Sequence, residues 1–330
     1  MMFEHTEKTD NLKETKALIE QHLHGGFGID FAKCDTDDYI LFSKNIIRYG
    51  VCGFFPTLAT DTVENLKLQI EKIKKAMDFQ NNASDSEIPM AKILGVHLEA
   101  CFLNPEKKGI HDTSQLLTPS VENYQQLEDD IIKIVTLAPE LDKNYELCKY
   151  LKTNGVRVSA GHCLGANLSC VDQVTHLYNA MGEFSHRGAS TAVSALSDDR
   201  IYTELIADGK HVQDDVLKIT FRTKPTDKVI LISDALPIAH SKNDSMEFCS
   251  KTVYLKDGRA VDEKGTMAGS TSFVADIIKR LVKNSFLDLQ TAVDMASVNL
   301  PHVQDYSSLV YWDNDCNIRA ININGNLITF

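Results

Sequence analysis

The chain has 330 residues, of which 43% are hydrophobic and 24% are charged, and its formal net charge is -12. A chain of this length and composition can bury one barrel-sized core or two smaller ones. The acidic balance argues against non-specific binding to nucleic acid, so an anionic ligand would need a local basic pocket.

The cysteines and the first residues indicate the cellular setting. The eight cysteines are scattered, without a C-x-x-C pair, which favours a reduced environment. Residues 1–16 are charged and lack the apolar core of a signal peptide. No apolar stretch is long enough to cross a membrane. We therefore expect a cytoplasmic protein that has neither a membrane nor a nucleic acid as partner.

Short apolar runs alternate with segments of helical spacing through most of the chain. The runs that predict strands are 17–24, 51–58, 93–96, 131–137, 156–162, 174–181, 202–207 and 228–232. The segments that predict helices are 37–49, 62–79, 121–130, 145–153, 216–223, 272–283 and 289–297. Residues 165–172 leave room for only about one helical turn between two strands.

This alternation predicts an α/β protein. About eight strand–helix units with polar or glycine-containing strand ends favour a closed (β/α)8, TIM-like barrel, and an open doubly wound sheet is the main alternative. No G-x-G-x-x-G follows a strand, which counts against a dinucleotide-binding fold. Outside the barrel, 249–262 predicts a hairpin and 309–330 predicts strands with a turn at Asn324-Gly325. The polar residues 1–15 are expected to be loosely packed.

Imidazoles and carboxylates follow six of the eight predicted strands. They are His22, His24, Glu99, His162, His176, His211 and Asp234. A single such histidine is commonly structural, and an H-x-H pair alone is weak evidence, but in a barrel all these side chains meet at one rim. Nitrogen and oxygen ligands without a thiolate suit Zn²⁺, with Fe²⁺ and Mn²⁺ as alternatives.

Such a cation would polarise a carbonyl group and lower the pKa of a bound water. An aspartate nearby could then accept the proton of that water and pass it to a leaving group. The residue pattern therefore predicts a metal-dependent hydrolase.

Six motifs in one order carry a family resemblance. They are Gly-Val-His-Leu-Glu-Ala-Cys-Phe-Leu-Asn-Pro-Glu-Lys-Lys-Gly-Ile-His at 95–111, Ala-Gly-His at 160–162, Thr-His-Leu-Tyr-Asn-Ala-Met at 175–181, Ile-Ala-Asp-Gly-Lys-His at 206–211, Ser-Asp-Ala at 233–235 and Gly-Thr-Met-Ala-Gly-Ser at 265–270. From about Ile19 to the C-terminus, the chain resembles the N-acetylglucosamine-6-phosphate deacetylases of the amidohydrolase superfamily.

The resemblance implies a metal-dependent hydrolase barrel over 19–300, with a hairpin insert at about 249–262. The C-terminal strands, 306–330, would belong to a reduced small β subdomain. The implied reaction is deacetylation of N-acetyl-D-glucosamine 6-phosphate to D-glucosamine 6-phosphate and acetate, in amino-sugar catabolism. Because family members take some phosphate contacts from a neighbouring subunit, the resemblance also implies a homodimer.

The resemblance also implies roles for individual residues. Glu99, His162 and His176 would hold the principal metal, and His22 and His24 would hold a second ion with Glu99 bridging, so one or two ions bind per subunit. Asp234 would act as general base and then general acid. The residues expected to bind the sugar phosphate are His111, Asn179, Ala180 (through its backbone), Arg187, His211 and Met267.

Departures from the family pattern keep two alternatives open. The leader before Ile19 is short, the segment 165–172 is short, and Ala100-Cys101 stands where the family usually has Gly-Pro. Cys101 would either approach the metal or serve as an inert small side chain. The alternatives are an amidohydrolase for another N-acyl sugar phosphate or a cyclic amide, and a non-catalytic homologue that binds sugar phosphate.

Overall fold

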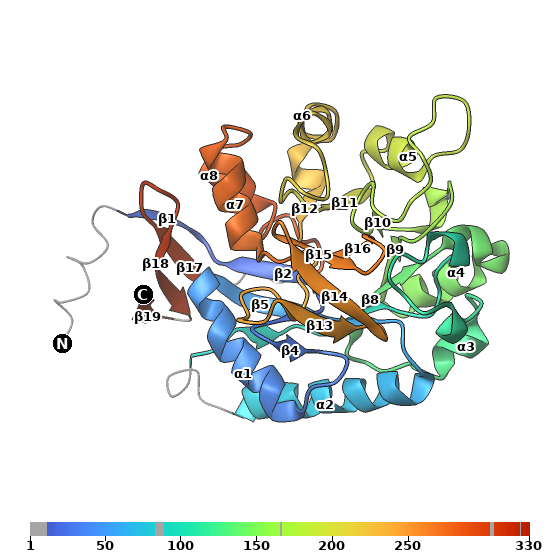
Figure 1. Cartoon of the computed structure of the whole chain (residues 1–330), viewed down its shortest axis with the longest axis horizontal. Coiled ribbons are helices and arrows are strands. Elements are labelled where there is room, and N and C mark those ends of the chain that lie inside the picture. The colour runs from blue at the N-terminus through green and yellow to red at the C-terminus, as the bar shows by residue number, and fades with distance from the viewer. Residues whose placement is uncertain (1–11, 83–88, 166, 304–306, 324) are drawn as a thin grey trace.

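A barrel of parallel strands forms the centre of the computed structural model, which describes residues 12–82, 89–165, 167–303, 307–323 and 325–330 (Figure 1). In barrel order the strands are β2 (Leu18–Leu23), β5 (Val51–Ala59), β7 (Val96–Glu99), β8 (Ile132–Leu137), β9 (Arg157–Ala160), β10 (Gln173–Val174), β11 (Tyr202–Leu205) and β12 (Val229–Leu231). The short β6 (Lys92–Ile93) also pairs with β5.

Residues just beyond β2 and β12 close the barrel. Leu23 and Ala235 form a parallel bridge. The amide of Asp234 donates to the carbonyl of His22 at 2.9 Å, and the amide of His24 donates to that of Ala235 at 2.8 Å. The predicted closed barrel is therefore confirmed, and the alternative prediction of an open doubly wound sheet is wrong.

Helices cover the outside of the barrel (Figure 1). The α-helices are α1 (Thr36–Ile46), α2 (Val63–Asn82), α3 (Val121–Gln125), α4 (Glu146–Thr153), α5 (Thr191–Ser197), α6 (Asp214–Thr223), α7 (Val274–Lys283) and α8 (Leu289–Asp294). The 3₁₀ turns are η1 (Ile47–Tyr49), η2 (Pro105–Lys107), η3 (Thr113–Gln115), η4 (Pro139–Leu141), η5 (Lys143–Tyr145), η6 (Leu168–Cys170) and η7 (Thr226–Lys228). No helix in the described part of the chain is long and apolar enough to cross a membrane.

Amphipathic spacing explains how the helices pack. In α7 the buried residues include Val274, Ile277, Ile278 and Leu281, which fall on one helical face. All nine residues of β5 are buried because the strand lies between the barrel interior and the helix layer.

The sixth barrel strand is shorter than its sequence predicts. A strand was expected over 174–181, but β10 ends at Val174. His176, Tyr178 and Ala180 have φ values of 31°, 77° and 49°, which are incompatible with an extended strand. The apolar side chains of this segment pack in a loop, so the prediction of strand over 175–181 is wrong. In the short crossover before β10, η6 supplies the single expected turn.

Two antiparallel sheets flank the barrel. The first contains β13 (Ser245–Phe248), β14 (Lys251–Lys256), β15 (Arg259–Asp262) and β16 (Met267–Gly269). It includes the predicted hairpin, and a bridge from Ala235 to Ser270 joins it to the barrel mouth. A two-stranded ribbon, β3 (Gly25–Gly26) and β4 (Ile29–Asp30), follows the first barrel strand.

The second sheet has the order β1 (Lys13–Lys16), β17 (Leu309–Trp312), β18 (Ile318–Ile323) and β19 (Asn326–Thr329). The expectation of loose packing is wrong for residues 13–15, because they pair with β17. The indole of Trp312, which is 1% exposed, donates to Thr15 Oγ1 at 2.8 Å and fixes this strand. Asn324 of the predicted turn lies outside the described residues.

Candidate active site

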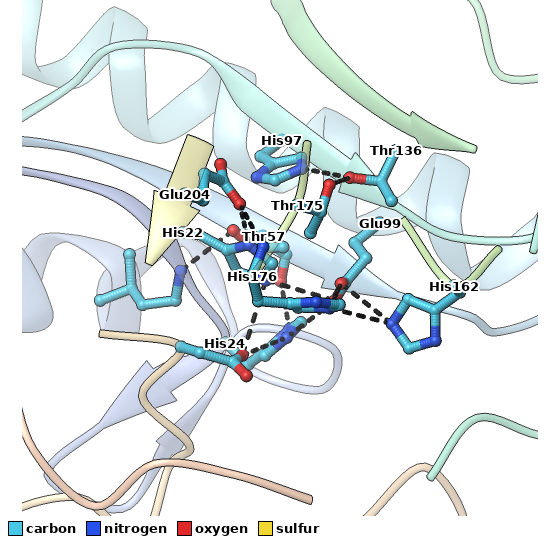
Figure 2. A network of polar contacts seen from close by, with 12 residues as sticks. His22, His24, Thr57, His97, Glu99, Thr136, His162, Thr175, His176 and Glu204 are labelled. Carbon is cyan, nitrogen blue, oxygen red and sulfur yellow. Dashed lines mark hydrogen bonds and ion pairs between the residues drawn. The ribbon is translucent and has the colours of Figure 1, made fainter. Parts of the chain in front are cut away.

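Side chains from the ends of several barrel strands meet around one carboxylate. Glu99 ends β7, while His162 and His176 each follow their strand by two residues. Glu99 Oε1 lies 3.3 Å from His162 Nε2 and 2.9 Å from His176 Nε2. The two imidazole nitrogens are 3.1 Å apart. Figure 2 shows both rings turned toward Glu99.

The other oxygen of Glu99 faces the histidine pair of the first strand. Glu99 Oε2 lies 3.3 Å from His22 Nε2 and 3.2 Å from His24 Nε2. Asp234 Oδ1 is 3.5 Å from His22 Nε2 and 3.3 Å from His24 Nε2. The structure therefore brings together the six residues that the sequence predicted for the metal centre and its proton carrier: His22, His24, Glu99, His162, His176 and Asp234.

The backbone around these residues is strained. His162, His176 and Asp234 have φ values of 49°, 31° and 52°, a region that side-chain-bearing residues rarely adopt. Each such conformation costs about 1–3 kcal/mol and persists where packing enforces it. The barrel holds these conformations immediately after its strands, where they turn the side chains inward.

Hydrogen bonds to the far nitrogen fix three of the imidazoles. The Nδ1–H of His22 donates to Glu204 Oε2 at 3.1 Å. Those of His24 and His162 donate to the carbonyls of Thr57 and Lys107, at 3.1 and 2.8 Å. These bonds leave each Nε2 lone pair facing the centre, which is how metal-binding histidines are oriented.

The donor set fits a divalent cation. His22 Nε2 is buried and has no hydrogen-bond partner among the described residues, and a bound cation would satisfy that lone pair. Among the described residues, three groups offer three converging ligand atoms each: Glu99 with His162 and His176, Glu99 with His22 and His24, and Glu204 with His22 and His97. Imidazole with carboxylate is the ligand set of catalytic zinc and related metals.

Electrostatics keep the central carboxylate ionised. Without a bound cation, burial raises the pKa of Glu99, but the charge of protonated His22 and the hydrogen bonds that His162 and His176 donate when Nε2 carries a proton outweigh it and hold the pKa well below its ordinary value.

A buried carboxylate that the sequence analysis missed lies behind the centre. Glu204 on β11 accepts hydrogen bonds from the side chains of Gln21 and Gln173, at 2.6 and 3.1 Å, in addition to His22. The backbone amide of His176 also donates to it, at 3.4 Å. A glutamate inside the apolar run 202–207 was the available signal, since a buried carboxylate requires partners.

A cavity of about 200 Å³ opens onto the centre. The predicted residues that line it are His24, Glu99, His111, His162, His176, Asn179, Ala180, His211, Asp234 and Met267. Phe248, which sequence analysis did not identify, also lines it and packs on His24 at 5.2 Å between ring centroids. Arg187 is exposed and does not line this cavity.

Two further histidines of the cavity are held in defined orientations. The amide of Thr60 donates to His111 Nδ1 at 3.2 Å, so the proton of this imidazole is on Nε2, 3.9 Å from Glu99 Oε2. Burial and the charge of His162 hold the pKa of His111 well below its ordinary value. His211 Nδ1–H donates to Asp208 Oδ2 at 2.8 Å, which leaves its Nε2 for a ligand.

Comparison with known proteins identifies the family. The chain is 30% identical over 305 residues to N-acetylglucosamine-6-phosphate deacetylase of Caenorhabditis elegans, covering 85% of this chain and 71% of that relative. It is 33% identical over 263 residues to the enzyme of that name from Bacillus subtilis, covering 77% of this chain and 65% of the relative. The chain belongs to the N-acetylglucosamine-6-phosphate deacetylase family. No family profile matches it.

Solved structures of this deacetylase family have the same fold. The enzyme of Thermotoga maritima superposes with a TM-score of 0.86 at 24% identity, covering 96% of this chain and 89% of the other. The enzyme of Pasteurella multocida superposes with a TM-score of 0.85 at 25% identity, covering 97% of this chain and 87% of the other. The resemblance seen in the six motifs is thereby confirmed, as is the metal-dependent hydrolase barrel.

One departure from the deacetylase pattern places a cysteine, Cys101, two residues after Glu99. Cys101 has a φ of 66° and is buried. Its thiol contacts the carbonyl of Asp61 at 3.9 Å, and burial raises its pKa to about 12. Among the described residues, no cysteine belongs to a group that could hold a metal. Cys101 is therefore an inert small side chain.

Proposed function

We propose that the chain hydrolyses the N-acetyl group of N-acetyl-D-glucosamine 6-phosphate to acetate and D-glucosamine 6-phosphate, in amino-sugar catabolism. The observation that carries the proposal is the convergence of Glu99, His162, His176 and Asp234 on one cavity, in a chain related to enzymes of that name.

Zn²⁺ is the cation we propose, with Fe²⁺ or Mn²⁺ as alternatives. Glu99, His162 and His176 would hold the principal ion, and His22 and His24 would hold a second with Glu99. When bound, a divalent cation supplies a Lewis acid that polarises the amide carbonyl and acidifies water.

The side chains around the cavity would perform the remaining steps. Asp234 lies beside His22 and His24 and lines the cavity, so its carboxylate would accept a proton from water and deliver it to the leaving amine. His211, whose Nδ1–H is held by Asp208, would in its doubly protonated form also donate from Nε2 to the acetamide oxygen as negative charge develops there.

The sugar and its phosphate would be bound by His111, Asn179, the backbone of Ala180 and Met267, which line the cavity. Arg187 lies outside this lining and is exposed, and we propose that its guanidinium binds the phosphate in a second copy of the chain. The functional unit we propose is therefore a homodimer.

A cytoplasmic location is also part of the proposal. All eight cysteines lie among the described residues, and none forms a disulfide. Free thiols persist in reducing compartments.

An acetate-release assay tests the proposed reaction. Purified chain loaded with Zn²⁺ should release acetate and free amine from N-acetylglucosamine 6-phosphate, and dialysis against a chelator should abolish release until metal is restored. N-acetylgalactosamine 6-phosphate and a cyclic amide should be compared as substrates. Absence of acetate with Zn²⁺, Fe²⁺ and Mn²⁺ alike would refute the proposal.

A further inference from the structure

A second cavity, of about 600 Å³, adjoins the catalytic cavity. Gly109 and Thr266 line both. The walls come from the loop after β7, the start of β14 and the turn between β15 and β16, and each of these contributes one lysine: Lys108, Lys251 and Lys264. We call this cavity the lysine pocket.

In the part of the chain that the structure describes, no carboxylate lies within ion-pair distance of the ammonium groups of the lysine pocket. Within the described ranges, none of the three lysines forms an ion pair, and the only side-chain hydrogen bond is from Lys108 Nζ to the carbonyl of His111, at 3.4 Å. Partial burial and then the charge of Lys108 lower the pKa of Lys251, and the charge of Asp262 opposes them by a smaller amount. Like charges drawn together in this way are stabilised by an anion between them.

The carboxylates near the lysine pocket are bound elsewhere or exposed. Asp262 Oδ1 accepts the backbone amides of Lys264 and Thr266 at 2.9 and 2.8 Å. Asp112 Oδ1 accepts the amide of Ser114 at 2.9 Å. Glu263 is exposed. Three lysines against Asp262 and Glu263 leave the lining with a formal charge of +1, in a chain whose net charge is -12.

We propose that the lysine pocket binds a phosphoryl group. The lysines supply the positive charge, and the hydroxyls of Ser250 and Thr252 in the same lining supply neutral donors to phosphate oxygens. The phosphoryl group would belong either to a free phosphate that binds beside the substrate, or to the substrate itself. The second source rests on the proposed function, and the lysines would then take the place of Arg187 as the cationic phosphate ligands.

Binding of inorganic phosphate tests the lysine pocket without turnover. Equilibrium dialysis with labelled phosphate should compare the wild type, Lys251→Gln, Lys251→Glu and Lys256→Gln, all carrying the same metal load. Lys256 lies on the same strand but is exposed and outside the lining. We expect Lys251→Gln to weaken binding about tenfold, Lys251→Glu to weaken it further, and Lys256→Gln to leave it unchanged.

Steady-state kinetics then distinguish the two sources of phosphate. If the phosphate of the substrate occupies the pocket, Lys251→Gln raises KM for N-acetylglucosamine 6-phosphate about tenfold and leaves kcat/KM for unphosphorylated N-acetylglucosamine unchanged. If free phosphate occupies it, only the dialysis result changes. Equal phosphate binding by the wild type and Lys251→Glu overturns the proposal. Dialysis requires no catalysis, so a failed acetate assay would not be confused with this result.

Discussion

Glu204 is a buried carboxylate that orients two histidines of the metal centre from behind (Figure 2). It accepts the Nδ1–H of His22 at 3.1 Å and the backbone amide of His176 at 3.4 Å. Glu204→Gln keeps the shape of the side chain but removes its charge. It also places an amide donor where the surroundings offer only donors, so at least one buried N–H loses its acceptor.

The pKa of Glu204 gives the size of the effect. Burial raises this pKa, but the charge and hydrogen bond of His22 and the charge of His97 outweigh burial and lower it from 4.5 to about 2. That difference corresponds to about 3 kcal/mol of stabilisation of the ionised form. The contribution of ionised Glu204 to the free energy of unfolding is fully present above pH 4.5 and is lost as the pH falls through about 2.

At pH 7, Glu204→Gln should therefore lower the free energy of unfolding of the metal-free chain by about 3 kcal/mol. It should also weaken zinc binding about 10- to 100-fold, because the hydrogen bond that orients His22 is weakened. Urea unfolding measures the first effect, and competition with a zinc-binding dye measures the second.

Glu71→Gln is the matched control, because Glu71 is an exposed residue in the middle of α2. It should change neither quantity. An unchanged urea midpoint together with unchanged zinc affinity in Glu204→Gln would refute the reasoning.

Three further predictions concern single side chains. Asp234→Asn should retain zinc but lose about 10²- to 10⁴-fold in kcat, as metal analysis and acetate release would measure; near wild-type turnover would exclude its role as proton carrier. Asp208→Asn should reduce kcat/KM about tenfold by freeing His211 Nδ1, whereas unchanged kinetics would show that this hydrogen bond does not position the imidazole. His302 should destabilise the fold in acid, because burial and then the charge of Arg157 lower its pKa to about 3. The unfolded chain then binds the proton first, so stability falls by up to about 1.4 kcal/mol per pH unit below about pH 6.5. Urea midpoints at pH 7 and pH 5 should differ less in His302→Phe than in the wild type, and equal differences would contradict the assignment.

The residues proposed for the metal centre could be brought together from the sequence because they follow strands of a single barrel. Parallel strands place their carboxyl ends at one rim, so a polar residue just beyond each strand is brought near the others whatever its distance along the chain. His22, Glu99 and His176 were therefore found without knowledge of any contact.

Contacts between distant elements were not predictable from local patterns. Glu204 and His22 are separated by 182 positions, and Thr15 and Trp312 by 297. Nothing in residues 13–16 indicates that β17 will supply a pairing edge. The strand expected over 174–181 failed for a related reason, because its apolar side chains pack in a loop around the site.

The occupancy of the centre tests the account most directly. Crystals grown with Zn²⁺ should give an anomalous difference peak at the zinc edge, within coordination distance of Glu99, His162 and His176. A second peak near His22 and His24 would correspond to the second ion. Full zinc loading in solution, with no anomalous peak within reach of Glu99, would contradict the claim that these strand ends form a metal centre.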